Sequence, residues 1–265
     1  MDVVYGAALG CDNARTGPAV NTDTYTVEAE VQQTHWWFAG RRRLLDRRLR
    51  ELGPQQTWRI LEVGAGTGAN LQVLRALGVK QVVACDLSVD ALQYSAQSAP
   101  VTLARADAAR LPFRSGSFDL LLAADVIEHL DDDAAALREF VRVLKPGGYL
   151  VLTVPAFPSL WGPQDHVAHH RRRYMRAALL SLLGQAGLRV HTCFYFNYLL
   201  FLPIWAARKA LLAARVHIRS ENEINTAWMN NVLKRVFFFD VDTAPRIRAP
   251  FGVSLYTVAN RPARP

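Results

Sequence analysis

The chain has 265 residues, of which 51% are hydrophobic, so it is long and apolar enough to bury a full core. We expect one domain with additions rather than two domains. Its 3 cysteines stand at unrelated spacings and no CxxC or histidine-rich pattern occurs, so we expect neither a disulfide framework nor a metal site. The first residues lack a basic start and a long apolar run, which predicts a cytoplasmic protein without a secretory signal.

Residues 1–52 precede the first predicted strand. Residues 1–24 show little periodicity, and we expect this start to be mobile. The segment 35–43 is followed by leucines at helical spacing, which predicts a helix. Its tryptophans have two interpretations: an anchor on the sheet, or a lid over a cofactor and the acceptor entrance. We expect its arginines to form a solvated face, with one reaching a cofactor carboxylate: Arg41, Arg42, Arg43, Arg47, Arg48 and Arg50.

A glycine-rich turn follows a short apolar run. Residues 60–63 predict a buried strand, the turn reads Gly64-x-Gly66-x-Gly68, and leucines at helical spacing come next. Glycines between a strand and a helix let the backbone approach a ligand, towards which the helix N–H groups point. The alternative is a tight turn that is glycine-rich by chance.

An acidic residue ends the second predicted strand, residues 82–86. Asp86 lies about 20 residues after the glycine turn, where an acid accepts hydrogen bonds from ribose hydroxyls. NAD and S-adenosylmethionine both carry such a ribose. Glu62 stands two residues before Gly64, and its carboxylate would repel a pyrophosphate but attract an ammonium or sulfonium group. These residues favour the methyl donor.

At this point the chain resembles the class I S-adenosylmethionine-dependent methyltransferases. Residues 61–68 match the first motif of that family, and similar motifs follow in order up to about residue 156. The resemblance implies S-adenosyl-L-methionine as cofactor. It also implies these cofactor-binding residues: Glu62, Gly64, Ala65, Gly66, Asp86, Leu87, Asp107, Ala108 and Asp125.

The remaining elements complete an α/β fold. Asp131–Asp133 begin a helix whose apolar stripe reaches Leu144 and which residues 146–148 stop. A strand is predicted over residues 148–154, a helix over 173–186, and strands over 188–196 and 253–259. We predict a doubly wound, Rossmann-like sheet, and the resemblance supplies seven mostly parallel strands with an antiparallel last strand. The expected parts are an N-terminal extension and helical lid (1–52), a core (53–197), an apolar and helical cap (198–250) and a final strand with tail (251–265).

The loop after the fifth strand carries the candidate catalytic residues. Prolines and a glycine exclude regular structure over the first half of residues 155–174. The loop resembles a subgroup pattern, Trp-x-x-His-Asp before His-Arg-Arg-Tyr, except that Gln164 replaces a histidine. Histidine suits proton removal from an attacking acceptor atom, and aspartate can orient it. We predict as catalytic residues His170, then His166, with Asp165; the alternative is that these histidines only shape the pocket or cap a helix.

We expect acceptor contacts from the aromatic and polar residues near this loop: Trp37, Trp161, His169 and Tyr174. The segment 194–207 is intensely apolar and too short to span a membrane. It is interpreted as a lid or homo-oligomer contact, or as a peripheral contact with the inner membrane surface through Arg208, Lys209, Arg215 and Arg219. A helix containing Ile224, Trp228 and Val232 completes this cap before Pro245 and Pro250.

These patterns predict methyl transfer to a hydrophobic small molecule, either a secondary metabolite or a lipid-linked or phosphorylated acceptor. The formal charge of +8 suits an anionic acceptor. Nucleic acid is not favoured, since acids at residues 125–128 replace the Asn/Asp-Pro-Pro-Tyr loop of amino-group nucleic-acid methyltransferases. The alternatives are an RNA methyltransferase, a nicotinamide-dependent oxidoreductase and a protein that binds the donor without catalysis.

Overall fold

The computed structural model describes residues 31–213 and 226–263. The predicted mobile start at residues 1–24 lies outside the described residues, as do Arg215, Arg219 and Ile224. Within the described ranges, no helix combines the length and the apolar character needed to cross a bilayer.

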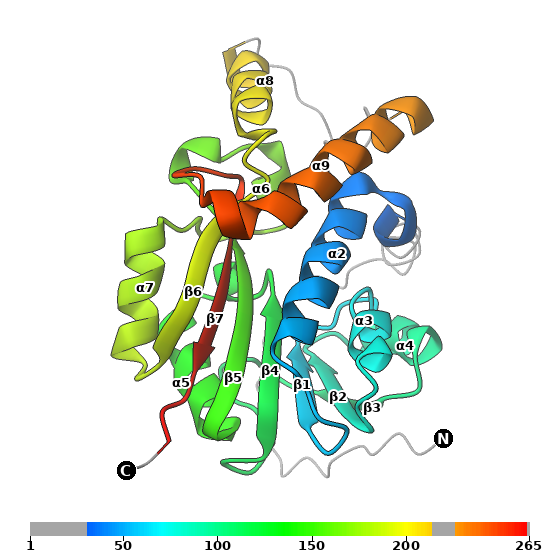
Figure 1. The fold of residues 1–265 in the computed structure, drawn as a ribbon, viewed down its shortest axis with the longest axis vertical. Helices are drawn as coiled ribbons and strands as arrows, with labels where there is room; N and C mark the ends of the chain where they lie inside the picture. The colour runs from blue at the N-terminus through cyan, green and yellow to red at the C-terminus, as the bar shows by residue number, and fades with distance from the viewer. Residues whose placement is uncertain (1–30, 214–225, 264–265) are drawn as a thin grey trace.

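A seven-stranded sheet forms the centre of the molecule (Figure 1), in the order β3-β2-β1-β4-β5-β7-β6. The β7 strand runs antiparallel to β5 and β6, whereas the other paired strands are parallel. The predicted doubly wound sheet with an antiparallel last strand is therefore confirmed. The strands are β1 (Arg59–Val63), β2 (Gln81–Asp86), β3 (Thr102–Arg105), β4 (Phe118–Ala124), β5 (Leu144–Pro155), β6 (Arg189–Phe196) and β7 (Ser254–Asn260).

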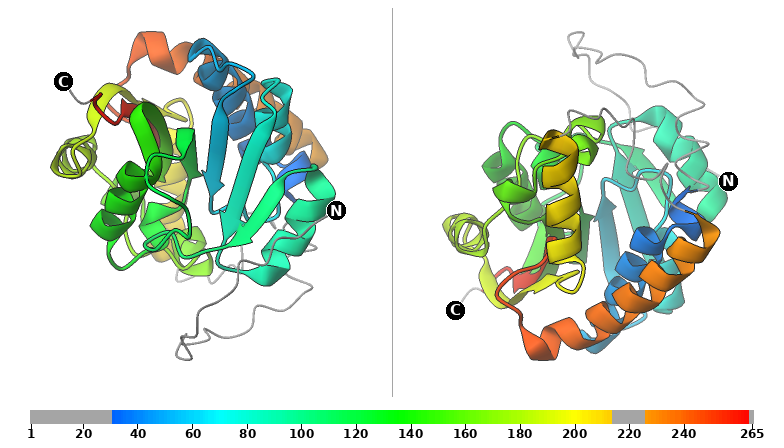
Figure 2. Two further views of the ribbon diagram at one scale, coloured as in Figure 1. Left: turned by 90° about the horizontal axis from the view of Figure 1, so that it is seen from below. Right: turned by 90° about the horizontal axis from the view of Figure 1, so that it is seen from above.

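Helices cover both faces of the sheet because its strands alternate apolar side chains between two cores. Leu61 and Val63 of β1 join one core with α5 (Asp133–Val143) and α7 (Arg176–Gln185). Ile60 joins the other core with α2 (Trp36–Glu51), α3 (Leu71–Ala76) and α9 (Ala227–Ile247). Seen from above, α2 and α9 lie side by side along the sheet (Figure 2). The other elements are α4 (Val89–Ser98), η1 (Ile127–His129), η2 (Pro158–Leu160), α6 (Pro163–Val167) and α8 (Phe201–Ala213).

The helix before β5 ends earlier than the sequence predicts. Leu144, expected in the apolar stripe of that helix, is the first residue of β5 and pairs with Phe118. A proline disfavours helical geometry at the residue before it, so Pro146 limits the helix to residues before Lys145. The predicted stop at residues 146–148 therefore lies inside the strand.

The loop between β5 and α7 contains regular structure that the sequence interpretation excluded. Both short helices in it, η2 and α6, begin with a proline, Pro158 and Pro163. Proline is compatible with the first turn of a helix, because the N–H groups there have no intrahelical partner. The prediction of an irregular segment was therefore wrong here, because it took these two prolines as helix breakers.

The arginines of α2 form the predicted solvated face only in part, because Arg47 and Arg50 are exposed but Arg41 is not. Arg43 and Arg47 both pair with Asp242 of α9, at 2.7 and 2.6 Å. Arg41 is buried and pairs with Asp125 after β4. The partners lie roughly 85 to 200 residues away in sequence, and only the close packing of α2 against α9 and the sheet brings them together.

The helix predicted before the last strand continues through a predicted boundary. Pro245 lies inside α9, in its last turn, and Arg248 ends the helix in a left-handed conformation. The sequence places Pro245 after the helix, because proline usually breaks one. The packing of Phe237, Val241 and Ala244 on the sheet sustains α9 across this proline.

The contact between α2 and α9 depends on a residue without a side chain. A Cβ at Gly40 would lie 2.1 Å from the ring of Phe237. Trp37 stacks on the same ring at 5.2 Å and on Phe196 at 6.0 Å. These contacts fasten the aromatic start of α2 to the sheet, which supports the anchor interpretation of its tryptophans.

We predict that Gly40→Ala lowers the free energy of unfolding by about 1–3 kcal/mol, because the added methyl overpacks this contact. The matched control is Gly184→Ala in α7, where a Cβ meets nothing within 4 Å. That change should be neutral or raise stability by up to about 1 kcal/mol, through the higher helix propensity of alanine. Urea denaturation measures both variants. Equal effects would contradict the packing argument.

Candidate functional site

The glycine turn between β1 and α3 has left-handed backbone at all three glycines. A Cβ at Gly64 would lie 2.5 Å from Val126, and one at Gly68 would lie 2.8 Å from Ser98, so both glycines permit close packing. A Cβ at Gly66 would meet nothing within 4 Å. The middle glycine therefore borders open space, where a ligand can approach the backbone.

Asp86 is the last residue of β2 and faces this turn. Its carboxylate accepts hydrogen bonds from the backbone N–H groups of Gly66 and Ser88, at 2.8 and 2.9 Å. The next residue, Leu87, has 63% of its surface exposed, which leaves an apolar side chain open beside an acid. After β3, Asp107 is exposed and accepts from the N–H of Ala109. Acid and apolar surface at adjacent strand ends suit a nucleoside.

Glu62 lies behind the turn and is fully buried. Asn70 donates to one of its oxygens at 2.9 Å, and the other oxygen has no protein partner among the described residues. Burial raises the pKa of Glu62 to about 7, although the hydrogen bond from Asn70 and the charge of Arg41 oppose this. A ligand cation near this carboxylate would recover the energy lost by its desolvation.

The N-terminal part of α2 and the residues before it cover this turn. Gln32 accepts a hydrogen bond from Thr67 at 2.6 Å. Arg41 pairs with Asp125 at 2.5 Å, while Thr153 of β5 donates to the other oxygen of Asp125 at 3.0 Å. The sequence predicted a site role for Asp125 but not its pairing with Arg41. The signal was available, because Arg41 lies four residues after Trp37 and hence on the same, buried side of the helix.

Backbone strain gathers at the same edge of the sheet. Asp125 follows β4, Phe157 follows β5 and Asn197 follows β6, and all three have φ of 57°. Left-handed backbone is uncommon for residues other than glycine and often occurs at functional sites. The carboxyl ends of these strands therefore form the edge at which ligand-binding loops are expected.

Asp165 is the centre of the loop after β5. It is fully buried, accepts from His170 Nδ1 and Arg173 Nε at 2.8 Å each, and also accepts from the N–H of Gly162. Burial alone would raise the pKa of Asp165, but the hydrogen bond from His170 and the charge of Arg173 lower it to about 2. Arg208 of α8 reaches the same carboxylate at 3.7 Å. The sequence missed both arginines as partners, since their contact depends on the fold of the loop.

The other predicted acceptor and catalytic residues take separate positions. Trp161 donates to His166 Nε2 at 3.0 Å on the exposed side of the loop. The hydroxyl of Tyr174 donates to Asp133 at 2.7 Å inside the protein, which joins the loop to α5. His169 has left-handed backbone and Trp37 belongs to the aromatic stack under α9. The structure therefore brings His170 and Asp165 together, and His166 with Trp161.

Glu128 and His129, in η1, lie beside His170. The rings of His129 and His170 meet edge to face at 4.8 Å between centroids. Glu128 is fully buried, and burial together with the charge of Asp125 raises its pKa. The charges of Arg41 and Arg173 oppose this rise in pKa, so Glu128 interacts with both the glycine-turn half of the site and the Asp165 half.

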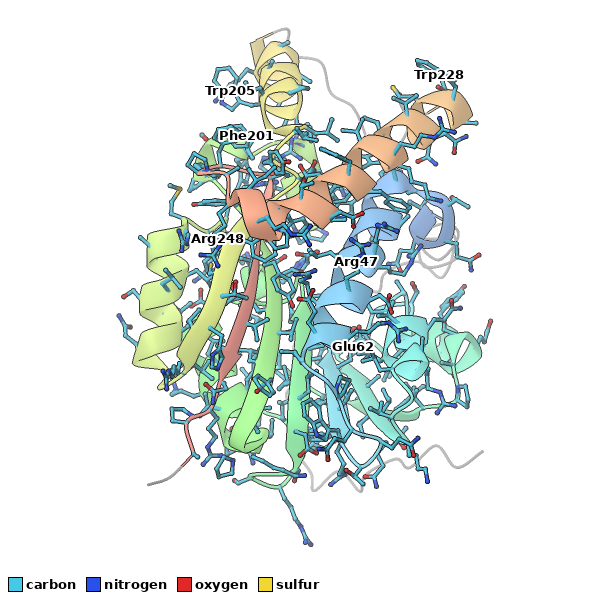
Figure 3. All side chains as sticks on the ribbon, viewed as in Figure 1. Arg47, Glu62, Phe201, Trp205, Trp228 and Arg248 are labelled. Carbon is cyan, nitrogen blue, oxygen red and sulfur yellow. The ribbon has the colours of Figure 1, made fainter. Side chains whose placement is uncertain are left out.

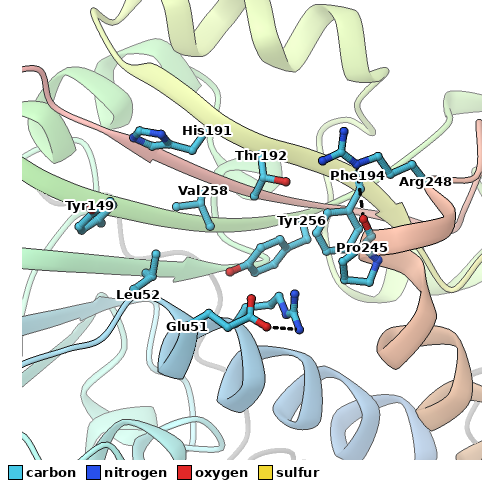
Figure 4. A pocket seen from close by; sticks show the side chains of 11 residues that line it. Glu51, Leu52, Tyr149, His191, Thr192, Phe194, Pro245, Arg248, Tyr256 and Val258 are labelled. Carbon is cyan, nitrogen blue, oxygen red and sulfur yellow. Dashed lines mark hydrogen bonds and ion pairs between the residues drawn. The ribbon is translucent and has the colours of Figure 1, made fainter.

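A surface pocket elsewhere is separate from this edge. It lies on the sheet face between the last turn of α2 and the end of α9 (Figure 4). None of the predicted site residues lines it. Its wall consists of Arg48, Glu51, Leu52, Tyr149, His191, Thr192, Phe194, Pro245, Arg248, Tyr256 and Val258.

Comparisons with known proteins agree with this arrangement. Residues 61–152 match the family model described as a methyltransferase domain. A Beutenbergia cavernae demethylmenaquinone methyltransferase is 36% identical over 113 residues, which cover 42% of this chain and 46% of the relative. A Mycobacterium tuberculosis protein named as a probable S-adenosylmethionine-dependent methyltransferase is 31% identical over 185 residues, or 68% of this chain and 62% of the relative. The chain thus spans less than two thirds of the length of these two relatives.

Solved structures show the same fold. The Haloferax volcanii methyltransferase in complex with the Trm112 activator superposes with a TM-score of 0.63 at 19% identity, covering 92% of this chain and 96% of that chain. The family match and the motifs that run from residue 61 to about residue 156 overlap on strands β1 to β5. The chain therefore belongs to the class I S-adenosylmethionine-dependent methyltransferases.

Proposed function

We propose that this protein transfers the methyl group of S-adenosylmethionine to a hydrophobic small-molecule acceptor. One observation carries the proposal: the glycine turn with Gly66, which Asp86 contacts, and the polar loop around Asp165 follow strands β1 and β5 at the same carboxyl edge of the sheet. Relatives named demethylmenaquinone methyltransferase support a small-molecule acceptor. Methyl transfer depends mainly on holding acceptor, methyl carbon and sulfur in line, which such an edge can do.

The donor is assigned to the glycine-turn half. In this proposal Asp86 holds the ribose, Leu87 contacts the adenine, and Glu62 and Asp125 balance the positive charges of the methionine part. Gly64, Ala65 and Gly66 supply close backbone, while Asp107 and Ala108 border the adenine. The acceptor is assigned to the other half, with Trp37, Trp161, His169 and Tyr174 as predicted contacts. His170, His166 and Asp165 stay predictions for the catalytic positions.

Transfer of label tests the proposal. Methyl-tritiated S-adenosylmethionine is incubated with the protein and a cell extract, and the products are fractionated by solvent. We expect label in the organic phase. Label recovered in RNA would refute the acceptor class, and the absence of label from every fraction, with the donor bound, would favour a non-catalytic binding protein.

We predict that Asp86→Asn weakens S-adenosylhomocysteine binding about 10- to 100-fold, because hydrogen bonds to a charged acceptor contribute about 1.5–3 kcal/mol. Isothermal titration calorimetry measures the affinity. Asp46→Asn on α2 is the control: Asp46 pairs with the exposed Arg50, and this variant should leave the affinity unchanged. An unaltered affinity in the Asp86 variant would remove the ribose assignment.

Donor affinity should also depend on pH through Glu62, whose pKa of about 7 is raised by burial. A donor cation stabilises the charged carboxylate and lowers its pKa, so binding releases a proton below pH 7 and weakens as the pH falls. We predict that S-adenosylmethionine binds roughly tenfold more weakly at pH 6 than at pH 7.5. Glu62→Gln should flatten this dependence. If the affinity of this variant still falls steeply with pH, a group other than Glu62 causes the pH dependence.

Exposed apolar side chains on α8 and at the start of α9 support a peripheral membrane contact. Trp205 and Trp228 have 40% and 76% of their surface exposed, and both lie beyond the carboxyl edge of the sheet (Figure 3). Leu202 is exposed on the same helix as Trp205, as is the cation Lys209. Exposed tryptophan beside basic residues suits the interface of an anionic bilayer. This face would admit an acceptor from the lipid phase to the site.

We predict that the protein cosediments with vesicles containing phosphatidylglycerol and that Trp205→Ser with Trp228→Ser removes most of this binding. The control is Ile247→Gln, an exposed apolar residue at the opposite end of α9. If sedimentation shows instead a dimer that the two tryptophan substitutions dissociate, the face is a homo-oligomer contact and the membrane proposal fails.

A further inference from the structure

Glu128, His129 and His170 form a cluster that the proposed methyl transfer does not require. Each offers one ligand atom, and these three atoms lie within 4.8 Å of one another. Ligand atoms on a tetrahedral zinc ion are about 3.4 Å apart, given bonds of about 2.1 Å. Small side-chain rotations would therefore close the cluster around an ion.

The carboxylate of Glu128 lacks a partner. The residue is fully buried, and neither of its carboxylate oxygens accepts a hydrogen bond within the part of the chain that the structure describes. Two arginines have charges that lower the pKa of Glu128, but each of them pairs with another acid: Arg41 with Asp125 and Arg173 with Asp165. An unpaired buried carboxyl group is costly, and such a group calls for an additional ligand.

His170 is already oriented as a metal ligand. Its Nδ1 lies 2.8 Å from Asp165, whose carboxylate also accepts from Arg173 and Gly162 and can only act as an acceptor there. Nδ1 therefore carries a proton that points at Asp165, which leaves Nε2 as the ring nitrogen that can bind a cation. A carboxylate that holds the far nitrogen of a histidine is the usual outer partner in zinc sites.

His129 gives the cluster access to solvent. Its side chain is exposed, whereas Glu128 is buried and His170 is half-buried, so an ion can reach the cluster from one side. Two imidazole nitrogens and one carboxylate oxygen suit Zn²⁺ or Co²⁺ better than Mg²⁺, which prefers oxygen ligands.

We propose that Glu128, His129 and His170 form a site for a divalent transition-metal cation such as Zn²⁺, with Asp165 as the residue that positions His170. The site replaces the expectation that the protein has no metal. With a cation bound, His170 would act as its ligand and not as a base, because a nitrogen bound to a cation cannot accept a proton.

Three protein ligands leave one coordination position of a tetrahedral ion open. An oxygen atom of the acceptor would fill this position, so the acceptor belongs to the class of hydroxyl compounds. This step rests on the proposed function. Coordination would release the hydroxyl proton to solvent water. The oxygen then bonds to the methyl carbon as the carbon–sulfur bond of the donor breaks, and the electron pair of that bond remains on sulfur.

Cobalt binding tests the site without activity. The full chain is treated with a chelator and titrated with Co²⁺, and visible absorption reports nitrogen and oxygen ligation. We expect saturation at one equivalent, with Zn²⁺ displacing Co²⁺. Glu128→Gln, which keeps the side-chain volume, and His170→Ala should each weaken Co²⁺ binding at least tenfold. Asp165→Asn should weaken it about 10- to 100-fold.

The control is His191→Ala, which removes an exposed histidine of β6 and should leave the titration unchanged. Circular dichroism checks that each variant is folded. No stoichiometric absorption, or equal binding by the wild type and the folded Glu128 variant, would overturn the site. S-adenosylhomocysteine binding in the same samples separates the two proposals: donor binding without metal binding refutes only this site, and metal binding without methyl transfer refutes only the proposed function.

Discussion

Buried carboxyl groups at the carboxyl edge of the sheet, two of which have a pKa raised by burial, govern the rest of the site. Glu62 and Glu128 are fully buried, Asp125 is partly buried, and the cation that pairs directly with one of them in the described chain is Arg41. Desolvation of unpaired carboxylates is expensive, so the folded chain bears a cost that cationic ligands would relieve. We propose two cationic ligands that offset this cost: a sulfonium donor beside Glu62 and a divalent cation beside Glu128.

The loop after β5 connects α8 to the carboxyl edge of the sheet. One carboxylate oxygen of Asp165 accepts from His170 and Arg173, and Arg208 lies 3.7 Å from the other oxygen. Since Arg208 belongs to α8, the helix with the exposed apolar surface is connected to the loop that carries predicted acceptor contacts. A change at the tip of α8 can therefore reach His170 through two charged contacts.

The sequence was sufficient for the parts of the fold that depend on local patterns. Short apolar runs and the glycine spacing predicted the sheet, and the resemblance supplied its antiparallel last strand. The sequence failed where distant segments meet, as with Asp242 opposite the arginines of α2 or Arg208 opposite Asp165. It also failed at prolines, because Pro158, Pro163 and Pro245 all lie within helices. For the site, single residues were predictable, but the unpaired state of Glu128 depends on three-dimensional packing.

The claim that this edge is built for a cationic cofactor can be tested with two ligands. Calorimetric titration at pH 7.5 would compare S-adenosylmethionine with NAD⁺, whose pyrophosphate would face the carboxylate of Glu62. The account predicts one-to-one binding of S-adenosylmethionine and no detectable binding of NAD⁺ at concentrations that saturate the methyl donor. Binding of NAD⁺ with equal or higher affinity would contradict it.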